Sequence, residues 1–236
     1  MKILAIDTSC NVATVAVCDH EKLISEYSMN HKRTHSQKIM PMVEEILKSC
    51  ELTIRDIDIF AAANGPGSFT GLRIGVSAVK GFAHAMNKPV VGVSTLEGLA
   101  YNLPYCKYRV YPIMDARCSQ VYNAVYEWGD YDLAEIISPR ALSLEELCGE
   151  IVSIGKKVVF LGDASLVYKE ALQNVLGELC IFTPSNQLMQ KASSIAHAVY
   201  KKVNKGETLL YSEFLPKYLR KPQAEREREM KSRHHE

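Results

Sequence analysis

The stretch Ile57-Asp58-Ile59-Phe60-Ala61-Ala62-Ala63-Asn64-Gly65-Pro66-Gly67 passes from a run of apolar residues into a turn rich in glycine and proline. The apolar run is typical of a strand buried in a sheet, and the turn ends it. We expect a helix directly afterwards, over residues 69–86, because apolar residues recur there at steps of four and three. These residues are Leu72, Val76, Val79, Ala83 and Met86. A buried strand joined by a tight turn to a helix indicates an α/β fold with parallel strands.

The flanking segments extend this pattern in both directions. Residues 2–7, 12–18, 22–29 and 89–93 are predicted strands, and residues 35–50 and 95–103 are predicted helices. The resulting order is β-β-β-α-β-α-β-α. It describes a three-stranded antiparallel meander followed by parallel strands that helices connect.

Around Pro104 the same order begins again. Ser143 starts one of the helices, because Ser143 and Glu146 have the spacing of a capping box. The predicted strands are 108–115, 120–127, 133–138 and 158–161, and the second helix is 164–176. The pattern β-β-β-α-β-α therefore occurs twice, although the two halves share little sequence.

Two such halves are the plan of the actin, hexokinase and Hsp70-like ATPases, the ribonuclease-H-like or ASKHA group. We therefore predict an α/β protein with an N-terminal domain, residues 1–103, and a smaller, reduced second domain, residues 104–189. A helix at about 190–203 is expected to pack back onto the first domain. Residues 204–236 form a C-terminal extension whose end, from Ala224 onward, is almost wholly charged.

Composition indicates an ordinary soluble protein of the cytoplasm. The 236 residues are 47% apolar and 23% charged, and the net charge is about +1, so no strong basic field favours direct binding of nucleic acid. No apolar run is long enough to span a bilayer, and the first residues resemble a strand rather than a signal peptide. The seven cysteines include no CxxC pair, which favours reduced thiols over a disulfide framework.

Asp7-Thr8-Ser9, at the end of the first strand, is a candidate phosphate site. A carboxylate, two hydroxyl groups and exposed turn amides at a strand end are what a phosphate–magnesium site requires. The alternative is a hairpin turn in which the Asp7 and Ser9 side chains satisfy local backbone groups. Similarly, the turn before helix 69–86 could attract an anion, but it is neither a GxxxxGK[ST] nor a GxGxxG loop.

Taken together, several motifs resemble the TsaB (YeaZ) family, from Met1 to about Lys221. The stretch from Asn64 to Gly75, which contains GPGSFTGLR, is the most specific of them. The others are residues 3–9, His35-Ser36, Ser94-Thr95-Leu96-Glu97, Met114-Asp115-Ala116-Arg117 and Tyr218-Leu219-Arg220.

The resemblance implies a comparison with TsaD, the catalytic paralogue, whose His-x-x-x-His pair binds a metal. Thr95 and Leu99 stand where these histidines would be, and Gln190 falls near the position of the later Asp ligand. Neither leucine nor threonine replaces imidazole as a ligand. Asp163 follows Gly162 where a second glycine would let a nucleotide approach. We therefore expect no catalytic residues, no bound metal and no cofactor of its own, beyond weak or shared binding of ATP or ADP in a complex.

The family implies a non-catalytic subunit that scaffolds and activates TsaD in the threonylcarbamoyladenosine (t6A) modification of tRNA. The family also implies TsaE, an ATPase, as a further partner. Contact with tRNA is expected to be indirect, through the complex. When the chain is alone, we expect a homodimer. The predicted partner interface lies on helices 35–50 and 69–86, so that Gly75→Leu should break the dimer and spare the fold. Its residues are Ile39, Val43, Ile46, Gly71, Leu72, Gly75, Val76 and Val79.

Two other functions remain open at this point. An ATP-dependent phosphotransferase of the same fold would depend on Asp7, and Asp163 argues against it. A metallopeptidase of the glycoprotease-like group would use His31 and His35, which are four residues apart, but no Glu follows His31 as in HExxH.

Overall fold

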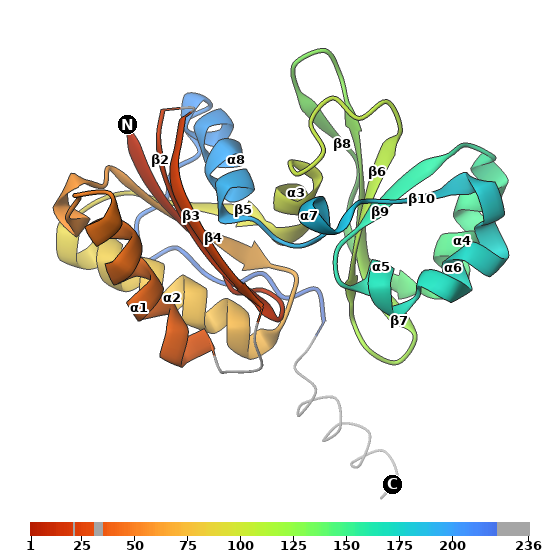
Figure 1. The fold of residues 1–236 in the computed structure, drawn as a ribbon, viewed down its shortest axis with the longest axis horizontal. Helices are drawn as coiled ribbons and strands as arrows, with labels where there is room; N and C mark the ends of the chain where they lie inside the picture. Colours follow the sequence, from red (N-terminus) through yellow and green to blue (C-terminus); the bar gives the residue numbers. More distant parts are fainter. Residues whose placement is uncertain (21, 31–34, 221–236) are drawn as a thin grey trace, which may run out of the picture.

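The chain forms two five-stranded sheets, each with helices packed on it (Figure 1). The computed structural model describes residues 1–20, 22–30 and 35–220. The first sheet has the order β3-β2-β1-β4-β5, and the second has the order β8-β7-β6-β9-β10. The first contains β1 (Lys2–Asp7), β2 (Val12–Asp19), β3 (Lys22–Asn30), β4 (Ile59–Gly65) and β5 (Val90–Ser94). The second contains β6 (Arg109–Asp115), β7 (Gln120–Trp128), β8 (Leu133–Ser143), β9 (Val158–Leu161) and β10 (Cys180–Phe182).

Both sheets have one topology, which confirms the predicted fold class. Three strands form an antiparallel meander, and the fourth strand then pairs in parallel with the first. Short turns suffice for the meander, whereas the parallel connections require helices. In the first half these helices are α1 (His35–Ser49) and α2 (Phe69–Met86), and α3 (Thr95–Ala100) follows β5. In the second half they are α4 (Leu144–Ile154), α5 (Ala164–Val167) and α6 (Lys169–Leu176), and α7 (Ser185–Leu188) and α8 (Ala192–Asn204) follow β10.

The second half differs from the prediction in three details. Strand β8 continues to Ser143, five residues beyond the predicted end. The helix predicted over 164–176 is interrupted at Tyr168, where α5 ends and α6 begins. Strand β10 was missed, because a strand of three residues is too short to show an apolar pattern. The second sheet is therefore reduced in the lengths of β9 and β10, and it keeps all five strands.

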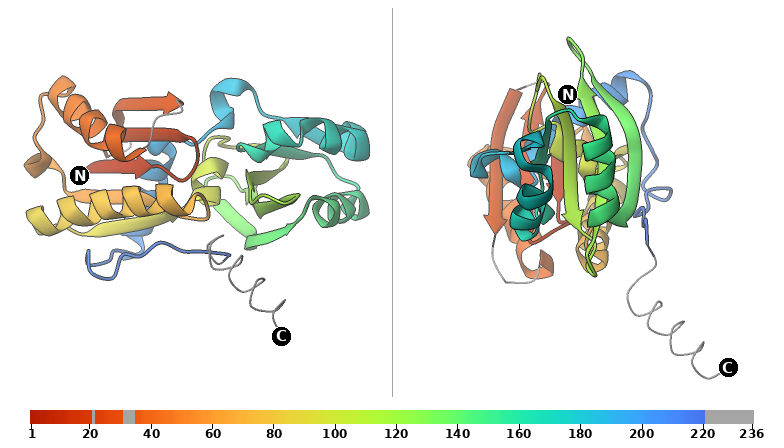
Figure 2. Two further views of the ribbon diagram at one scale, coloured as in Figure 1. Left: turned by 90° about the horizontal axis from the view of Figure 1, so that it is seen from below. Right: turned by 90° about the vertical axis from the view of Figure 1, so that its right-hand side faces the viewer.

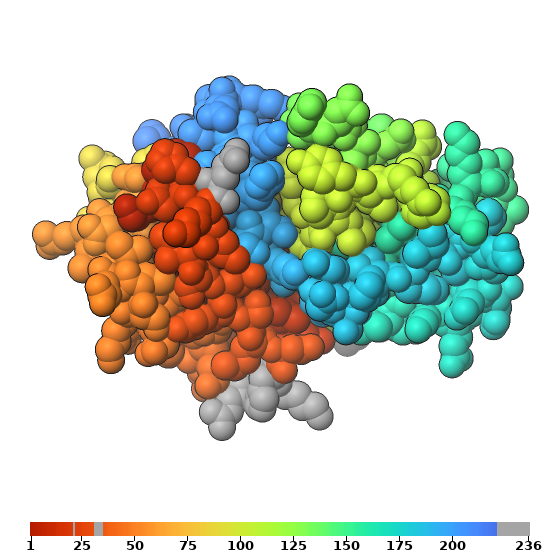
Figure 3. Space-filling model, turned by 45° about the horizontal axis from the view of Figure 1, so that its top comes forward, coloured from red at the N-terminus to blue at the C-terminus, as the bar shows by residue number. Residues whose placement is uncertain are grey.

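The first sheet is covered on both faces. Along β1, Leu4 and Ile6 belong to a core shared with α1 and α2, whereas Ile3 and Ala5 belong to a core shared with α8. This alternation follows from the two-residue period of a strand. Helix α8 thus packs on the first domain although it follows the second in sequence, and it lies between the two in the space-filling view (Figure 3).

The second sheet packs outward against its own helices and inward against the first domain. Its outer core includes Ile113 and Phe160 with Leu147 of α4 and Leu172 of α6. Its inner core joins Val110, Met114 and Tyr126 to Leu96 and Leu99 of α3. This inner apolar cluster fixes the two domains to each other on the α3 side of the molecule.

Residues 207–220, which we call the C-terminal strap, return along the first domain toward the second (Figure 2). Leu209 forms a β-bridge with Val90, and Phe214 is fully buried in the first-domain core. The predicted charged tail from Ala224 lies outside the described residues. None of the helices within the described ranges has the length and apolarity needed to cross a bilayer.

Candidate functional site

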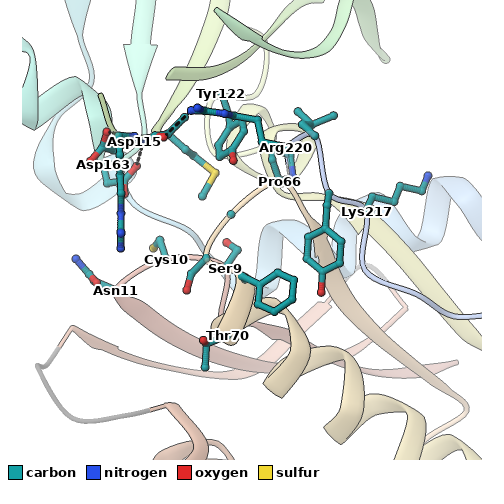
Figure 4. A pocket seen from close by; sticks show the side chains of 18 of the residues that line it. Ser9, Cys10, Asn11, Pro66, Thr70, Asp115, Tyr122, Asp163, Lys217 and Arg220 are labelled. Atoms are coloured by element: carbon teal, nitrogen blue, oxygen red, sulfur yellow. Dashed lines mark hydrogen bonds between the residues drawn. The ribbon is translucent and has the colours of Figure 1, made fainter. Parts of the chain in front are cut away.

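A polar cleft with a volume of about 420 Å³ lies between the domains. It is found where β1 and β4 of one sheet and β6 and β9 of the other end, which is the edge at which sheets of this class bind ligands. Figure 4 shows Ser9 and Cys10 at its floor, with Asp115 and Asp163 on one side and Lys217 on the other. Most of its remaining wall comes from Pro66–Thr70 at the start of α2, from Met114–Arg117 at the end of β6, and from the strap residues Lys217–Arg220. Asn11, His35 and Tyr122 complete it.

Of the three residues predicted to hold phosphate, only Ser9 lies in the wall of the cleft. Asp7 and Thr8 lie beneath it, 1% and 2% exposed. Asp7 Oδ1 accepts a hydrogen bond from the Ser9 backbone N–H at 2.8 Å, and the Thr8 hydroxyl donates to the Gly71 carbonyl at 2.7 Å. Asp7 therefore satisfies a local backbone group, as the alternative expects. The Thr8 contact instead joins segments far apart in sequence, and the buried Ser9 hydroxyl has no hydrogen-bond partner among the described residues.

The turn between β4 and α2 owes its shape to close backbone approaches. A Cβ on Gly67, at φ +156°, would lie 2.4 Å from the Ser9 carbonyl oxygen, and one on Gly65, at φ +128°, would lie 2.2 Å from the Lys217 carbonyl oxygen. Only glycine accommodates both the contact and the positive φ. Ser68 then caps α2 by accepting from the Gly71 N–H at 3.3 Å. The most specific motif of the sequence thus holds three segments of the cleft together.

The carboxylate of Asp163 lies in the second-domain wall of the cleft. Its Oδ1 accepts hydrogen bonds from the backbone N–H groups of Asp115 at 3.2 Å and Ala164 at 2.9 Å. Burial raises the pKa of this carboxyl from 3.8 to about 6, while those backbone hydrogen bonds oppose the rise. The two amides are already occupied, and the carboxylate would repel a phosphate placed beside it.

The three positions matched to the metal ligands of TsaD do not fit a metal. Leu99 and Thr95 are fully buried, and Leu99 belongs to the apolar cluster between the domains. The Gln190 side-chain carbonyl accepts from the Cys10 thiol at 2.7 Å. Within residues 1–20, 22–30 and 35–220 there is no group of three His, Cys, Asp or Glu side chains that could hold a metal ion.

His35 has a structural contact at the start of α1. Its Nε2–H donates to the Cys10 carbonyl oxygen at 2.6 Å and so fastens the helix to the β1–β2 turn. His31, the other member of the pair considered from the sequence, lies outside the described residues.

Comparisons with known proteins identify the family of this chain. The model of the family described as TsaD, tRNA N6-adenosine threonylcarbamoyltransferase, matches residues 22–228. The Bacillus subtilis protein named tRNA threonylcarbamoyladenosine biosynthesis protein TsaB is 32% identical over 225 residues, which cover 95% of this chain and 96% of that protein. The chain belongs to the TsaB family.

Relatives that carry the transferase name are matched over less of their own length than the B. subtilis TsaB. A Kosmotoga olearia tRNA N6-adenosine threonylcarbamoyltransferase is 35% identical over 116 residues, but these are 43% of this chain and 35% of that protein. In contrast, the solved structure of YeaZ from Pseudomonas aeruginosa superimposes with a TM-score of 0.78 at 25% identity and covers 92% of this chain and 99% of that one. The likeness to TsaB therefore extends over the whole fold.

For this TsaB-family chain, the predicted interface side chains need correction. All eight residues are buried within the chain itself. A Cβ on Gly75 would lie 2.5 Å from the Thr8 hydroxyl oxygen, so Gly75→Leu would disturb the fold and not merely a dimer. The apolar stripe marks the face that each helix packs against its own sheet. Ile39, Val43, Ile46, Val76 and Val79 belong to the first-domain core, Leu72 is fully buried, and Gly71 and Gly75 lie against Thr8.

A different surface of the same two helices is open. An apolar groove of about 440 Å³ runs between α1 and α2. Met40, which is 49% exposed, and Ala85 lie on its two sides, and Val43 is the one predicted interface residue that reaches it. The groove is lined by Met40, Pro41, Val43, Glu44, Leu47, Ile54, Phe82, Ala85 and Met86. Met40, a methionine on α1 outside the buried stripe, was the sequence signal for this surface.

Proposed function

We propose that this chain acts in the biosynthesis of threonylcarbamoyladenosine in tRNA as a non-catalytic subunit that pairs with the catalytic paralogue TsaD and activates it. The name of the B. subtilis relative, which matches the chain over nearly its whole length, supports the pathway. A cytoplasmic location is part of the proposal.

The observation that carries the non-catalytic role is the environment of Leu99. Its side chain is fully buried among apolar residues of both domains, at the position matched to a metal-binding histidine of TsaD. A hydrocarbon side chain offers no ligand atom to a metal ion. The chemistry of the transferase would then belong to TsaD.

The same cleft favours at most weak or shared binding of ATP or ADP. Ser9 and the start of α2 could contact a phosphate, but Asp163 presents a carboxylate opposite them. An ATP-dependent phosphotransferase would need a positive charge beside Asp163 to offset the repulsion between its carboxylate and the phosphates of ATP. A nucleotide shared with a partner subunit in the complex remains compatible with the geometry.

The partner surface in this proposal is the α1–α2 groove. An open apolar groove between two helices suits an apolar helix face of another protein. In the proposal that protein is TsaD, or a second copy of this chain when TsaD is absent. TsaE and tRNA join through the complex.

The test is reconstituted modification of unmodified tRNA by the partner proteins, with this chain added or omitted. Product threonylcarbamoyladenosine is measured after digestion of the tRNA to nucleosides. We expect modification to depend on the chain and to saturate at one chain per TsaD. Equal modification without the chain would remove the proposed role.

A further inference from the structure

The C-terminal strap is firmly attached to the first domain. Leu209 exchanges two backbone hydrogen bonds with Val90, at 2.8 and 3.0 Å, and Phe214 is fully buried beside Gly92. Farther along, the Lys217 N–H donates to the Asn64 carbonyl at 2.6 Å. The strap therefore moves with the first domain up to the edge of the cleft.

At the mouth of the cleft, an aromatic contact holds the strap on the start of α2. The rings of Tyr218 and Phe69 stack with their centroids 4.8 Å apart. Arg73 lies over the Phe69 ring at 4.1 Å and donates from Nε to the Tyr218 hydroxyl oxygen at 3.1 Å. These contacts fix the direction in which the chain leaves the first domain.

Arg220 then reaches across to the second domain. Its Nη1 donates to the Ala116 carbonyl oxygen at 2.9 Å, a contact drawn in Figure 4. Ala116 opens the β6–β7 turn, in which Arg117, Cys118 and Ser119 all have φ between 54° and 62°. Left-handed backbone costs about 1 kcal/mol or more for each non-glycine residue, so this turn needs contacts that hold it.

On the α3 side of the molecule, apolar packing joins the two domains. There the apolar cluster around Leu96 and Leu99 connects the domains, and the Asn102 amide donates to the carbonyls of Gln187 and Met189. Both chain segments that cross between the domains lie on that side, at residues 101–108 and 183–191. The cleft is thus bounded by a broad apolar contact at its base and by a polar contact from the strap at its mouth.

We propose that Arg220 is an interdomain latch: by holding the β6–β7 turn to the strap, it keeps the cleft closed, and its release lets the second domain rotate about the α3 cluster. The latch is a charge-assisted hydrogen bond at a partly exposed site, which is strong enough to bias the equilibrium between open and closed forms and weak enough to be released. The cleft floor at Ser9 becomes accessible in the open form. This inference does not depend on the proposed role in tRNA modification.

The test compares wild type, Arg220→Ala and Lys217→Ala by hydrogen–deuterium exchange and small-angle X-ray scattering. Lys217→Ala is the matched control, because it removes a positive charge from the same strap while its backbone N–H still bonds Asn64. Figure 4 shows the Lys217 side chain extending away from Arg220. No partner or ligand is needed, so the result is independent of the reconstitution.

For Arg220→Ala we expect exchange in residues 115–120 to be about tenfold faster, the ratio that one such hydrogen bond ordinarily supports. Strands β1 and β2 should be unchanged, and the radius of gyration should increase. Lys217→Ala should behave as wild type. Unchanged exchange in Arg220→Ala, the same increase in Lys217→Ala, or faster exchange throughout the chain would each overturn the latch.

Discussion

Asp7 lies at the end of β1 with its carboxyl group buried beneath the cleft, and it illustrates how single residues decide the chemistry. Burial raises its pKa from 3.8 to about 6, while hydrogen bonds from Ser9 act in the opposite direction. No salt bridge to Asp7 is found in the described part of the chain. Its negative charge at neutral pH therefore costs stability.

Asp7→Asn should make the protein more stable than wild type at pH 7. The native carboxyl binds its proton more tightly than the unfolded one, so wild-type stability falls as pH rises from about 4 to about 6. The rise in pKa corresponds to on the order of 3 kcal/mol. This is an upper bound, because asparagine keeps an acceptor for Ser9 but also buries an NH2 group that needs acceptors of its own. Urea unfolding of both proteins between pH 4.5 and 7.5 measures the difference.

The sign of the stability difference between Asp7→Asn and wild type shows whether the charge of Asp7 is destabilising. The advantage of Asp7→Asn should grow with pH and level off above about 6. Asp163 has a raised pKa too, but it is present in both proteins and cancels. A variant that is less stable than wild type at pH 7, or a difference that does not change with pH, would mean that the charge of Asp7 is compensated.

At the scale of elements, α2 shows what a helix pattern does and does not reveal. Its bounds, Phe69–Met86, match the prediction, because Ser68 caps one end and Asn87 adopts left-handed geometry at the other. The pattern did not reveal which stripe faces which neighbour, since an apolar stripe looks the same against a sheet or a partner. The two glycines Gly71 and Gly75 identify the inward face of α2, because both lie against Thr8, directly after β1.

Two glycine substitutions in helices should have opposite effects. Gly149→Ala, at an exposed position of α4 where a Cβ meets nothing within 4 Å, should raise the free energy of unfolding by about 0.5–1 kcal/mol. Gly75→Ala should lower it, because its Cβ would lie 2.5 Å from the Thr8 hydroxyl oxygen. Urea denaturation of the two variants measures both. Stabilisation by Gly75→Ala would contradict the close approach of α2 to β1.

At the scale of the whole molecule, the repeated order of elements was sufficient to predict two similar halves, since apolar periodicity survives when sequence identity does not. The residues that follow β1 and those at the end of β6 line the same cleft, because the two strands end at facing edges of their sheets. The strap could not be predicted. It has no regular pattern, and its contacts come from backbone groups and from Phe214, Tyr218 and Arg220.

The cleft lies between the domains, the groove lies on the first domain, and the two share no lining residue. A subunit that only assembles with TsaD should depend on the groove, whereas an enzyme should depend on the cleft. Substitutions at the two surfaces therefore separate the two functions.

The most direct measurement is the rate of threonylcarbamoyladenosine formation in the reconstituted system with Ala85→Arg, Ser77→Arg and Asp7→Asn. Ala85 lies exposed in the groove, and Ser77 is an exposed residue of α2 outside it. We expect Ala85→Arg to lose both binding to TsaD and modification, and Ser77→Arg and Asp7→Asn to keep the wild-type rate. Full modification with Ala85→Arg, or loss of modification with a folded, TsaD-bound Asp7→Asn, would contradict the role of a non-catalytic subunit.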